Sequence, residues 1–262
     1  MSVWCYTIYL FDIISIYCYN NSMYIYQLLT SNGRIDRYGL LNVVAFIVAL
    51  FVALILHEIA HGLVALWNGD NTAKAYGRLS LNPIKHFDWM GLLLMLIVGF
   101  GWAKPVPVNP NNFRNRKVGA ITVSIAGVVT NITIAFFAAM GWVLLSKVNV
   151  YGMKDGLYYF VYFCAQLMNM LLALNVSFAL FNILPLYPLD GYRLLSCFVS
   201  QDNGFMRFLR KYSYYIVLGF VALNLLSAYI PVIPNLSPLY WYVSGLGGLI
   251  RNGFEQFWRL IF

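Results

Sequence analysis

Long apolar runs separated by short polar connections dominate the pattern of this chain. Three runs, 39–67, 118–146 and 157–184, are each longer than the roughly 20 residues that a helix needs to cross a bilayer. Residues 212–230 form a further run, and the short, glycine-rich stretch 236–250 could return the chain across the membrane. The pattern therefore predicts an all-α polytopic membrane protein with about five to six transmembrane helices.

One apolar run is too short for an ordinary span. Residues 89–102 number only 14, and as a helix they would reach about 21 Å, less than the ~30 Å hydrocarbon core. The next stretch, 103–117, contains three prolines and four basic residues, and we expect an extended path around Pro105 and Pro107. We therefore predict a short re-entrant or β-hairpin element near 89–110, surrounded by protein or a water-filled cavity.

The composition agrees with a membrane protein. The chain is 61% hydrophobic and 10% charged, whereas a soluble domain carries about 25% charged residues. The net charge is +8, but the basic residues lie in short connections, where they act as topology signals and contact anionic lipid headgroups. There is no basic helix or nucleic-acid fold signature, so we expect the lipid bilayer as a partner and no nucleic acid.

The chain divides into one domain and two flanking pieces. We assign 39–250 to a single transmembrane domain and 251–262 to a C-terminal tail. Residues 1–38 have an open status: they lack the basic start of a cleavable signal peptide, and they could be a poor first span, an interfacial segment or an upstream extension. No signal for an oligomeric state is evident.

The distribution of basic residues predicts which side of the membrane each connection faces. The connections 103–117 and 186–211 are both rich in Lys and Arg, and they flank the spans 118–146 and 157–184 on the same side. By the positive-inside rule that side is cytoplasmic. The basic stretch 68–88 shares it if 89–102 is re-entrant.

The sequence His57-Glu58-Ile59-Ala60-His61 lies within the run 39–67. On a helix this spacing places two imidazoles on one face, where both can bind one zinc ion, and Glu58 can act as base toward a zinc-bound water. The alternative is that Glu58 lies at the end of a helix and that the two histidines are near it by chance. It is disfavoured because an ionisable residue near the bilayer centre costs about 2.5–3.5 kcal/mol on insertion scales.

A catalytic zinc needs a third protein ligand. Asp190 follows a long apolar run and two prolines, which break the helix and can aim a carboxylate back into a bundle. His86 is the competing candidate, and a turn Asp before Gly191 is the alternative for Asp190. The four cysteines, Cys5, Cys18, Cys164 and Cys197, contain no CxxC pair and argue against a thiolate site or a disulfide framework.

Two motifs carry a resemblance to a known family. HEIAHG, followed far downstream by NILPLYPLDG, resembles the site-2 protease family of intramembrane zinc metalloproteases. RLSLNPIKHFDWMG and GWAKPVPVNP are similar to its compact prokaryotic members, which lack a PDZ insertion. The similarity covers roughly 39–230, and the two motifs in this order are highly specific.

The resemblance implies roles for individual residues. His57, His61 and Asp190 would bind one Zn²⁺ per chain, and Glu58 would activate the water. Asn182 would hold the substrate backbone or stabilise the oxyanion. Family members carry a Gly-Pro-x-x-Asn stretch, which here runs from Gly127 to Asn131 without the proline. Asn131 would therefore contact substrate or, as the alternative, make an interhelical hydrogen bond.

The implied function is an intramembrane zinc endopeptidase that cleaves transmembrane segments of membrane proteins in regulated intramembrane proteolysis. Its expected location is the prokaryotic plasma membrane, with the active site toward the cytoplasmic half. One alternative is a membrane metal-binding protein or transporter without peptidase activity. A transporter should carry further ionisable residues along a pathway, whereas the clear spans hold only His57, Glu58 and His61. Another is a membrane zinc hydrolase that cuts a lipid-attached group.

Overall fold

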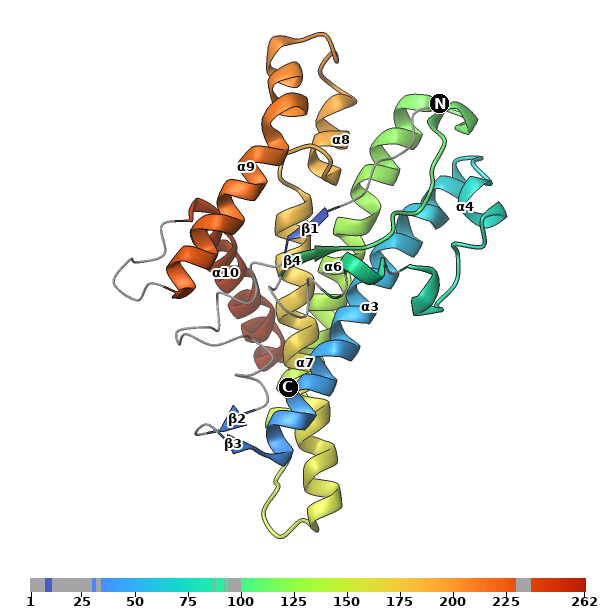
Figure 1. Cartoon of the computed structure of the whole chain (residues 1–262). Coiled ribbons are helices and arrows are strands. Elements are labelled where there is room, and N and C mark those ends of the chain that lie inside the picture. The colour runs from blue at the N-terminus through green and yellow to red at the C-terminus, as the bar shows by residue number, and fades with distance from the viewer. Residues whose placement is uncertain are drawn as a thin grey trace.

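Three long helices pack against one another at the centre of the molecule, in a computed structural model that describes residues 8–10, 30–31, 34–86, 88–91, 93, 100–229 and 237–262 (Figure 1). These helices are α3 (Arg37–Trp67), α6 (Arg116–Ser146) and α7 (Asp155–Asn182). Among the described residues they are the helices long and apolar enough to cross a membrane. Helices over the three clearest predicted runs are thereby confirmed, and their length and apolar composition are those of a membrane protein.

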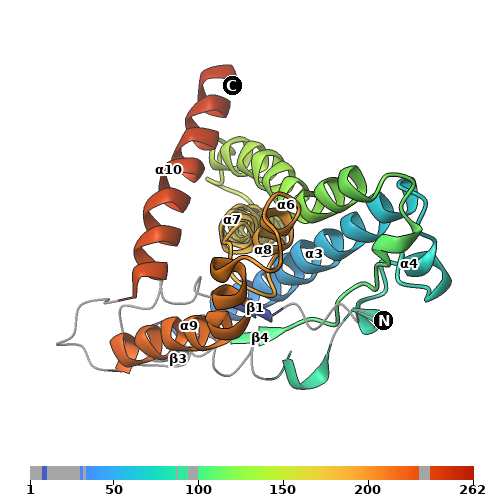
Figure 2. The same cartoon turned by 90° about the horizontal axis from the view of Figure 1, so that it is seen from above.

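The remaining elements surround this core. Further helices among the described residues include α4 (Thr72–Ala75), α8 (Asp190–Ser196), α9 (Gly204–Tyr229) and α10 (Pro238–Ile261), with 3₁₀ turns η1 (Pro83–Lys85) and η2 (Pro110–Asn112). Short strands are β1 (Ile8–Leu10), β2 (Thr30–Ser31), β3 (Arg34–Ile35) and β4 (Phe100–Trp102). Seen along α7, the three long helices lie at the centre and α9 and α10 lie outside them (Figure 2).

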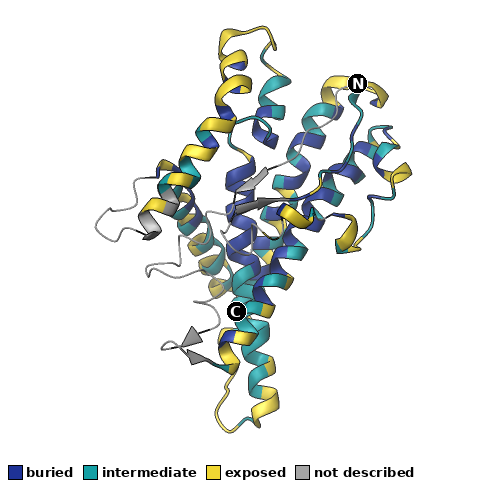
Figure 3. Ribbon diagram, in the orientation of Figure 1, coloured by how far each residue is buried: buried dark blue, intermediate teal, exposed yellow. Residues whose placement is uncertain are grey.

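Small and large apolar side chains alternate where α3, α6 and α7 meet. Burial is concentrated at this crossing (Figure 3). The buried core residues are Phe46, Ala49, Leu50, Ala53 and Leu54 of α3, Ala135, Ala138 and Ala139 of α6, and Leu171, Leu172, Leu174, Val176 and Phe178 of α7. Alanines let helix backbones approach closely, which is how helices associate where no hydrophobic effect drives them together.

Polar caps fix the starts of two long helices. The side chain of Asp36 accepts a hydrogen bond from the Gly39 amide at 2.7 Å and starts α3. Asn115 accepts from the amides of Lys117 and Val118, each at 3.1 Å, and starts α6. Each cap satisfies amides that have no acceptor within the first helical turn.

The connection between α3 and α6 begins and ends at the same end of the bundle. The amide of Arg114 donates to the carbonyl of Asn68 at 2.8 Å, and the Asn68 side chain donates to Thr122 Oγ1 at 3.0 Å. The ammonium of Lys117 lies 5.7 Å from the ring of Phe198, so the stretch after α8 reaches the same end. The basic connections therefore gather at one end of the molecule.

The predicted hairpin near 89–110 falls partly outside the described residues, which omit 87, 92 and 94–99. Within the described part, β4 pairs antiparallel with β1, with Ile8 opposite Trp102. Among the described residues, the strand paired with β4 thus belongs to the N-terminal segment. The hairpin and the count of five to six spans stay predictions, as does the status of 1–38, most of which is not described.

The residues expected to form a separate tail continue a helix. α10 runs through the predicted boundary at 250 without a break, and its last turns pack on the core. The indole Nε1 of Trp258 donates to the carbonyl of Phe136 in α6 at 2.9 Å. Arg251 donates to Asn169 Oδ1 in α7 at 3.2 Å. The tail was predicted from two basic residues, Arg251 and Arg259, that follow the glycine-rich stretch; the division of the chain into a domain and a tail stays a prediction.

Trp258→Ala should therefore destabilise the protein. The substitution removes a hydrogen bond to α6 and the ring contact with Phe136, whose centroid lies 4.9 Å away. We expect a loss of roughly 2 kcal/mol or more, measured as a lower melting temperature in detergent. Leu260→Ala is the matched control, because Leu260 is 88% exposed; equal shifts in the two variants would contradict the packing of α10.

Candidate metal centre

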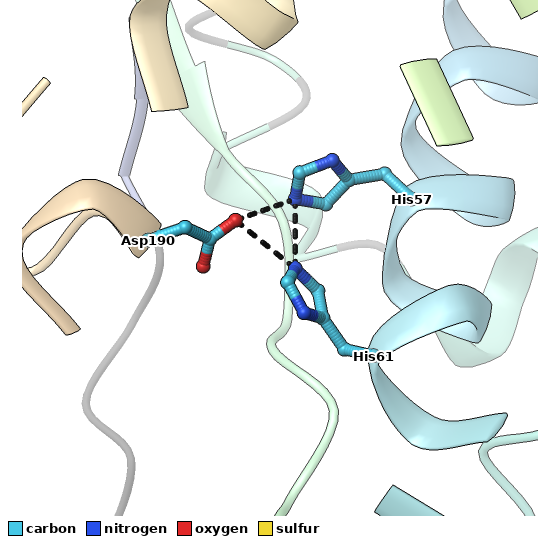
Figure 4. Close-up of side chains that lie close together, drawn as sticks. All are labelled: His57, His61 and Asp190. Atoms are coloured by element: carbon cyan, nitrogen blue, oxygen red, sulfur yellow. Dashed lines mark hydrogen bonds and ion pairs between the residues drawn. The ribbon is translucent and has the colours of Figure 1, made fainter. Parts of the chain in front are cut away.

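Three side chains converge at the middle of the bundle. His57 and His61 project from one face of α3, and Asp190 projects toward them from the first residue of α8 (Figure 4). The two Nε2 atoms are 3.0 Å apart. Asp190 Oδ2 lies 3.3 Å from Nε2 of His57 and 3.1 Å from Nε2 of His61. All three side chains are buried.

The opposite ring nitrogens fix the tautomers. Nδ1 of His61 lies 2.7 Å from the carbonyl oxygen of Val123, which can only accept, so Nδ1 carries the proton. Nδ1 of His57 lies 3.3 Å from Oδ1 of Asn131 and donates to it in the same way. In the neutral form of each ring, Nε2 then presents its lone pair to the other Nε2 and to a carboxylate oxygen.

This arrangement requires a positive charge at its centre. Three lone pairs within 3.3 Å of one another repel, and a buried carboxylate is costly without a cation or a proton. A tetrahedral zinc with metal–donor bonds of about 2.0–2.2 Å has donor–donor edges of about 3.3–3.6 Å. The observed separations are close to those edges, so the donor set fits a zinc ion, and three protein ligands leave one position open.

Asp190 is held in place by its neighbours along the chain. A Cβ atom on Gly191 would come within 2.1 Å of the carbonyl oxygen of Ile183 and 2.4 Å of that of Leu184. Only glycine therefore allows the start of α8 to approach the end of α7 this closely. Nη1 of Arg193 lies 3.2 Å from Asp190 Oδ1, so the guanidinium takes one carboxylate oxygen while the other faces the histidines.

Glu58 is buried beside the cluster and has a specific hydrogen bond. It is 3% exposed, and its Oε2 accepts from the backbone amide of Val106 at 2.8 Å. The donor belongs to the extended stretch that follows β4, where the prolines predicted an extended path. A carboxylate adjacent to a metal ligand and hydrogen-bonded to a backbone amide is placed to exchange a proton with a water at the site.

The other predicted residues lie in different surroundings. His86 is buried, and its Nε2 donates to the Ser80 carbonyl at 2.7 Å, apart from the three-residue cluster. Asn131 contacts His57, the interhelical hydrogen bond that the sequence left as an alternative to substrate contact. Asn182 is buried and donates to the Phe178 carbonyl at 3.0 Å, while its Oδ1 has no hydrogen-bond partner among the described residues. A substrate role for either asparagine stays a prediction.

Comparison with known proteins gives two relatives. "Putative zinc metalloprotease YwhC" of Bacillus subtilis (strain 168) is 44% identical over 173 residues, which cover 62% of this chain and 77% of the relative. The chain belongs to the zinc metalloprotease family of YwhC.

The second relative, "Zinc metalloprotease MJ0392" of Methanocaldococcus jannaschii, is 28% identical over 160 residues, which cover 61% of this chain and 36% of the relative. This metalloprotease chain therefore spans only about a third of MJ0392. No protein-family model matches the chain. No solved structure matches it either.

Two groups at the metalloprotease site could not be predicted from the sequence. The Val123 carbonyl and the Val106 amide are backbone groups, so no residue type marks them. The sequence identified Gly127 only as the start of the stretch that ends at Asn131, and its contact with His57 is seen in the structure. A Cβ atom on Gly127 would lie 2.3–2.5 Å from three atoms of the His57 ring, so glycine is needed for α6 to pass over this ligand.

Gly127→Ala should weaken metal binding by displacing the His57 ring. Loss of a group that orients a metal ligand lowers affinity about 10- to 100-fold, and we expect a loss of that size in a metal titration of the purified protein. Gly141→Ala is the matched control in the same helix, because its Cβ would meet the flexible side chain of Met168. If Gly127→Ala binds metal as tightly as Gly141→Ala and wild type do, the close packing of α6 over His57 does not affect metal binding.

Proposed function

We propose that this protein is an integral membrane zinc endopeptidase of the site-2 protease type, which cleaves transmembrane segments of membrane protein substrates. The observation that supports it best is the position of the metal centre within α3, a helix of 31 residues that is apolar enough to span a bilayer. A soluble peptidase would have no reason to place its ligands on such a helix.

The depth of the site follows from helix geometry. His57 is 20 residues from Arg37 and 10 from Trp67, the two ends of α3, which correspond to about 30 Å and about 15 Å along the axis. The nearer end is the one at which the basic connections gather. With that end cytoplasmic, the site lies in the cytoplasmic half of the plasma membrane.

His57, His61 and Asp190 would hold one zinc ion per chain. Zinc, when bound, supplies a Lewis acid that polarises the scissile carbonyl and acidifies water. Glu58 removes the proton of the attacking water and returns it to the leaving amine. Asn182 is proposed to assist at the substrate backbone or the developing oxyanion, because its amide is buried at the end of α7, near the turn that leads to Asp190.

The substrate is proposed to be a transmembrane helix. Its scissile bond is locked in intrahelical hydrogen bonds, so the segment has to unwind before attack. Regulated intramembrane proteolysis is the process that such an activity serves. A metal-binding protein without peptidase activity gains no support, because it would need neither the buried Glu58 nor its fixed orientation.

Glu58→Gln should abolish cleavage and retain zinc, because the amide keeps the size and the acceptor oxygen but cannot take a proton. Cleavage of a purified single-span substrate in nanodiscs measures the activity, and lipid-linked peptides test the alternative hydrolase. We expect a loss of at least about 10³-fold in kcat/KM, within the range for removal of a general base. Glu255→Gln, an acid on α10 paired with Arg259, is the control. If Glu58→Gln retains cleavage, Glu58 is not the general base.

Zinc content should separate the two candidates for the third ligand. Asp190→Ala removes one of three converging donors and should lose the ion on dialysis, whereas His86→Ala should keep one zinc per chain, because His86 lies outside the cluster. Elemental analysis of the purified variants gives the stoichiometry. If His86→Ala loses zinc and Asp190→Ala keeps it, then His86, and not Asp190, is the third zinc ligand.

A further inference from the structure

Two charged side chains are buried outside the metal centre, in the connection that follows α3. Asp70 is 0% exposed and Arg78 is 7% exposed. Burying a charge is costly unless hydrogen bonds compensate it. Neither residue belongs to the three-residue metal cluster. The hydrogen bonds of each residue show which part of the structure it stabilises.

Arg78 binds the start of an extended segment, Lys104–Asn109, which has neither helix nor strand. Its Nη2 donates to the carbonyl of Lys104. The amide of Lys104 in turn donates to the carbonyl of His86 at 2.9 Å. Both backbone groups of Lys104 are therefore fixed by the connection after α3.

Asp70 binds the other end of the same segment. Its Oδ2 accepts from the amide of Asn109 at 2.7 Å. Its Oδ1 accepts from the amide of Thr72 at 3.1 Å, from the Thr72 hydroxyl, and from Nδ2 of Asn112 at 2.8 Å. Burial alone would raise the pKa of Asp70, but these hydrogen bonds outweigh it and hold the pKa below its usual value. Asp70 is thus an anion at neutral pH.

Between the two anchors lies the amide that orients the proposed base. Pro105 and Pro107 have no N–H, so Val106 carries the one backbone donor between Lys104 and Val108. That donor goes to Glu58 Oε2 at 2.8 Å. The side chain of Val106 is buried, and a Cβ atom on Gly62 would lie 3.1 Å from its Cγ1. The segment is thus pressed against α3 beside Glu58.

We propose that Asp70 and Arg78 are positioning residues for Glu58: each fixes one end of Lys104–Asn109, so that the segment presents the Val106 amide to the carboxylate. The inference rests on the proposed function for the role of Glu58. A segment without a helical or sheet hydrogen-bond ladder has only its ends and its packed side chains to restrain it. Without either anchor, Val106 would move relative to α3, and the carboxylate would lose the hydrogen bond from the Val106 amide.

The experiment compares Arg78→Met and Asp70→Asn with matched controls in the same connection. Lys74→Met removes an exposed cation, and Asp88→Asn alters an acid whose Oδ1 accepts from the amides of Met90 and Gly91. The readouts on the purified full chain in nanodiscs are hydrogen–deuterium exchange of residues 103–109, zinc content, and kcat and KM on a single-span substrate.

In the two test variants we expect exchange of residues 103–109 to accelerate by roughly tenfold or more, while zinc content stays at the wild-type value. We expect kcat to fall by about 10- to 100-fold, as for a misplaced catalytic group, with KM within about twofold. Arg78→Lys should restore part of the activity because its ammonium can donate to the Lys104 carbonyl. Zinc loss in parallel with kcat, or no change in exchange, would overturn the proposal.

A double variant tests whether Arg78 acts through the Val106 amide. Val106→Pro deletes the donor directly, so adding Arg78→Met to it should lower kcat no further. Additive losses would overturn the proposal, because Arg78 would then act by a route other than the Val106 amide, such as its charge near Glu58. If wild type fails to cleave any substrate, the proposed function fails, but the exchange data still decide whether the anchors hold Val106 against Glu58.

Discussion

The convergence of three lone pairs on one buried point is the constraint on which the rest of the structure depends. The two imidazole Nε2 atoms and a carboxylate oxygen lie 3.0–3.3 Å apart, and these groups repel one another without a cation or a proton between them. Such a cluster forms only if the scaffold holds each donor against that repulsion. α3 supplies two donors, α6 orients both rings through the Val123 carbonyl and Asn131, and the turn after α7 delivers Asp190.

Close helix packing makes this possible, and it constrains residue size at particular positions. α6 can offer a carbonyl and an amide oxygen to the two rings only where its backbone passes directly over them, and Gly127 is the residue at which a side chain would strike His57. Gly191 has the same role at the start of α8, where a side chain would strike the backbone at the end of α7. The alanines of the shared core bring the helices to this separation. The same close packing of the helices therefore also sets the positions of the three metal-binding side chains.

The sequence predicted the parts of this site that depend on residue type and spacing. His57, Glu58 and His61 follow from a helical repeat, and Asp190 follows from an acidic residue after a proline-broken helix end, together with the family resemblance. The same reasoning could not find the Val106 amide, because every residue except proline carries one, and its partner is 48 positions away. The pairing of β4 with β1 and the continuation of α10 past residue 250 escaped for a related reason. Both are set by tertiary contacts, which a local sequence pattern does not contain.

A backbone amide is well suited to orient the buried carboxylate of Glu58, the proposed base. A side-chain donor at the same place would have rotamers to lose, and a His or Lys there would add a basic group beside the metal ligands. The Val106 amide has no such freedom once its segment is fixed, and the flanking prolines offer Glu58 no competing donor. The charges that fix the segment, Asp70 and Arg78, lie beyond the end of α3, where a charge costs less than at the bilayer centre. Asp70 and Arg78 are themselves buried, but they lie outside the long apolar helix and act on Glu58 through a short stretch of extended backbone.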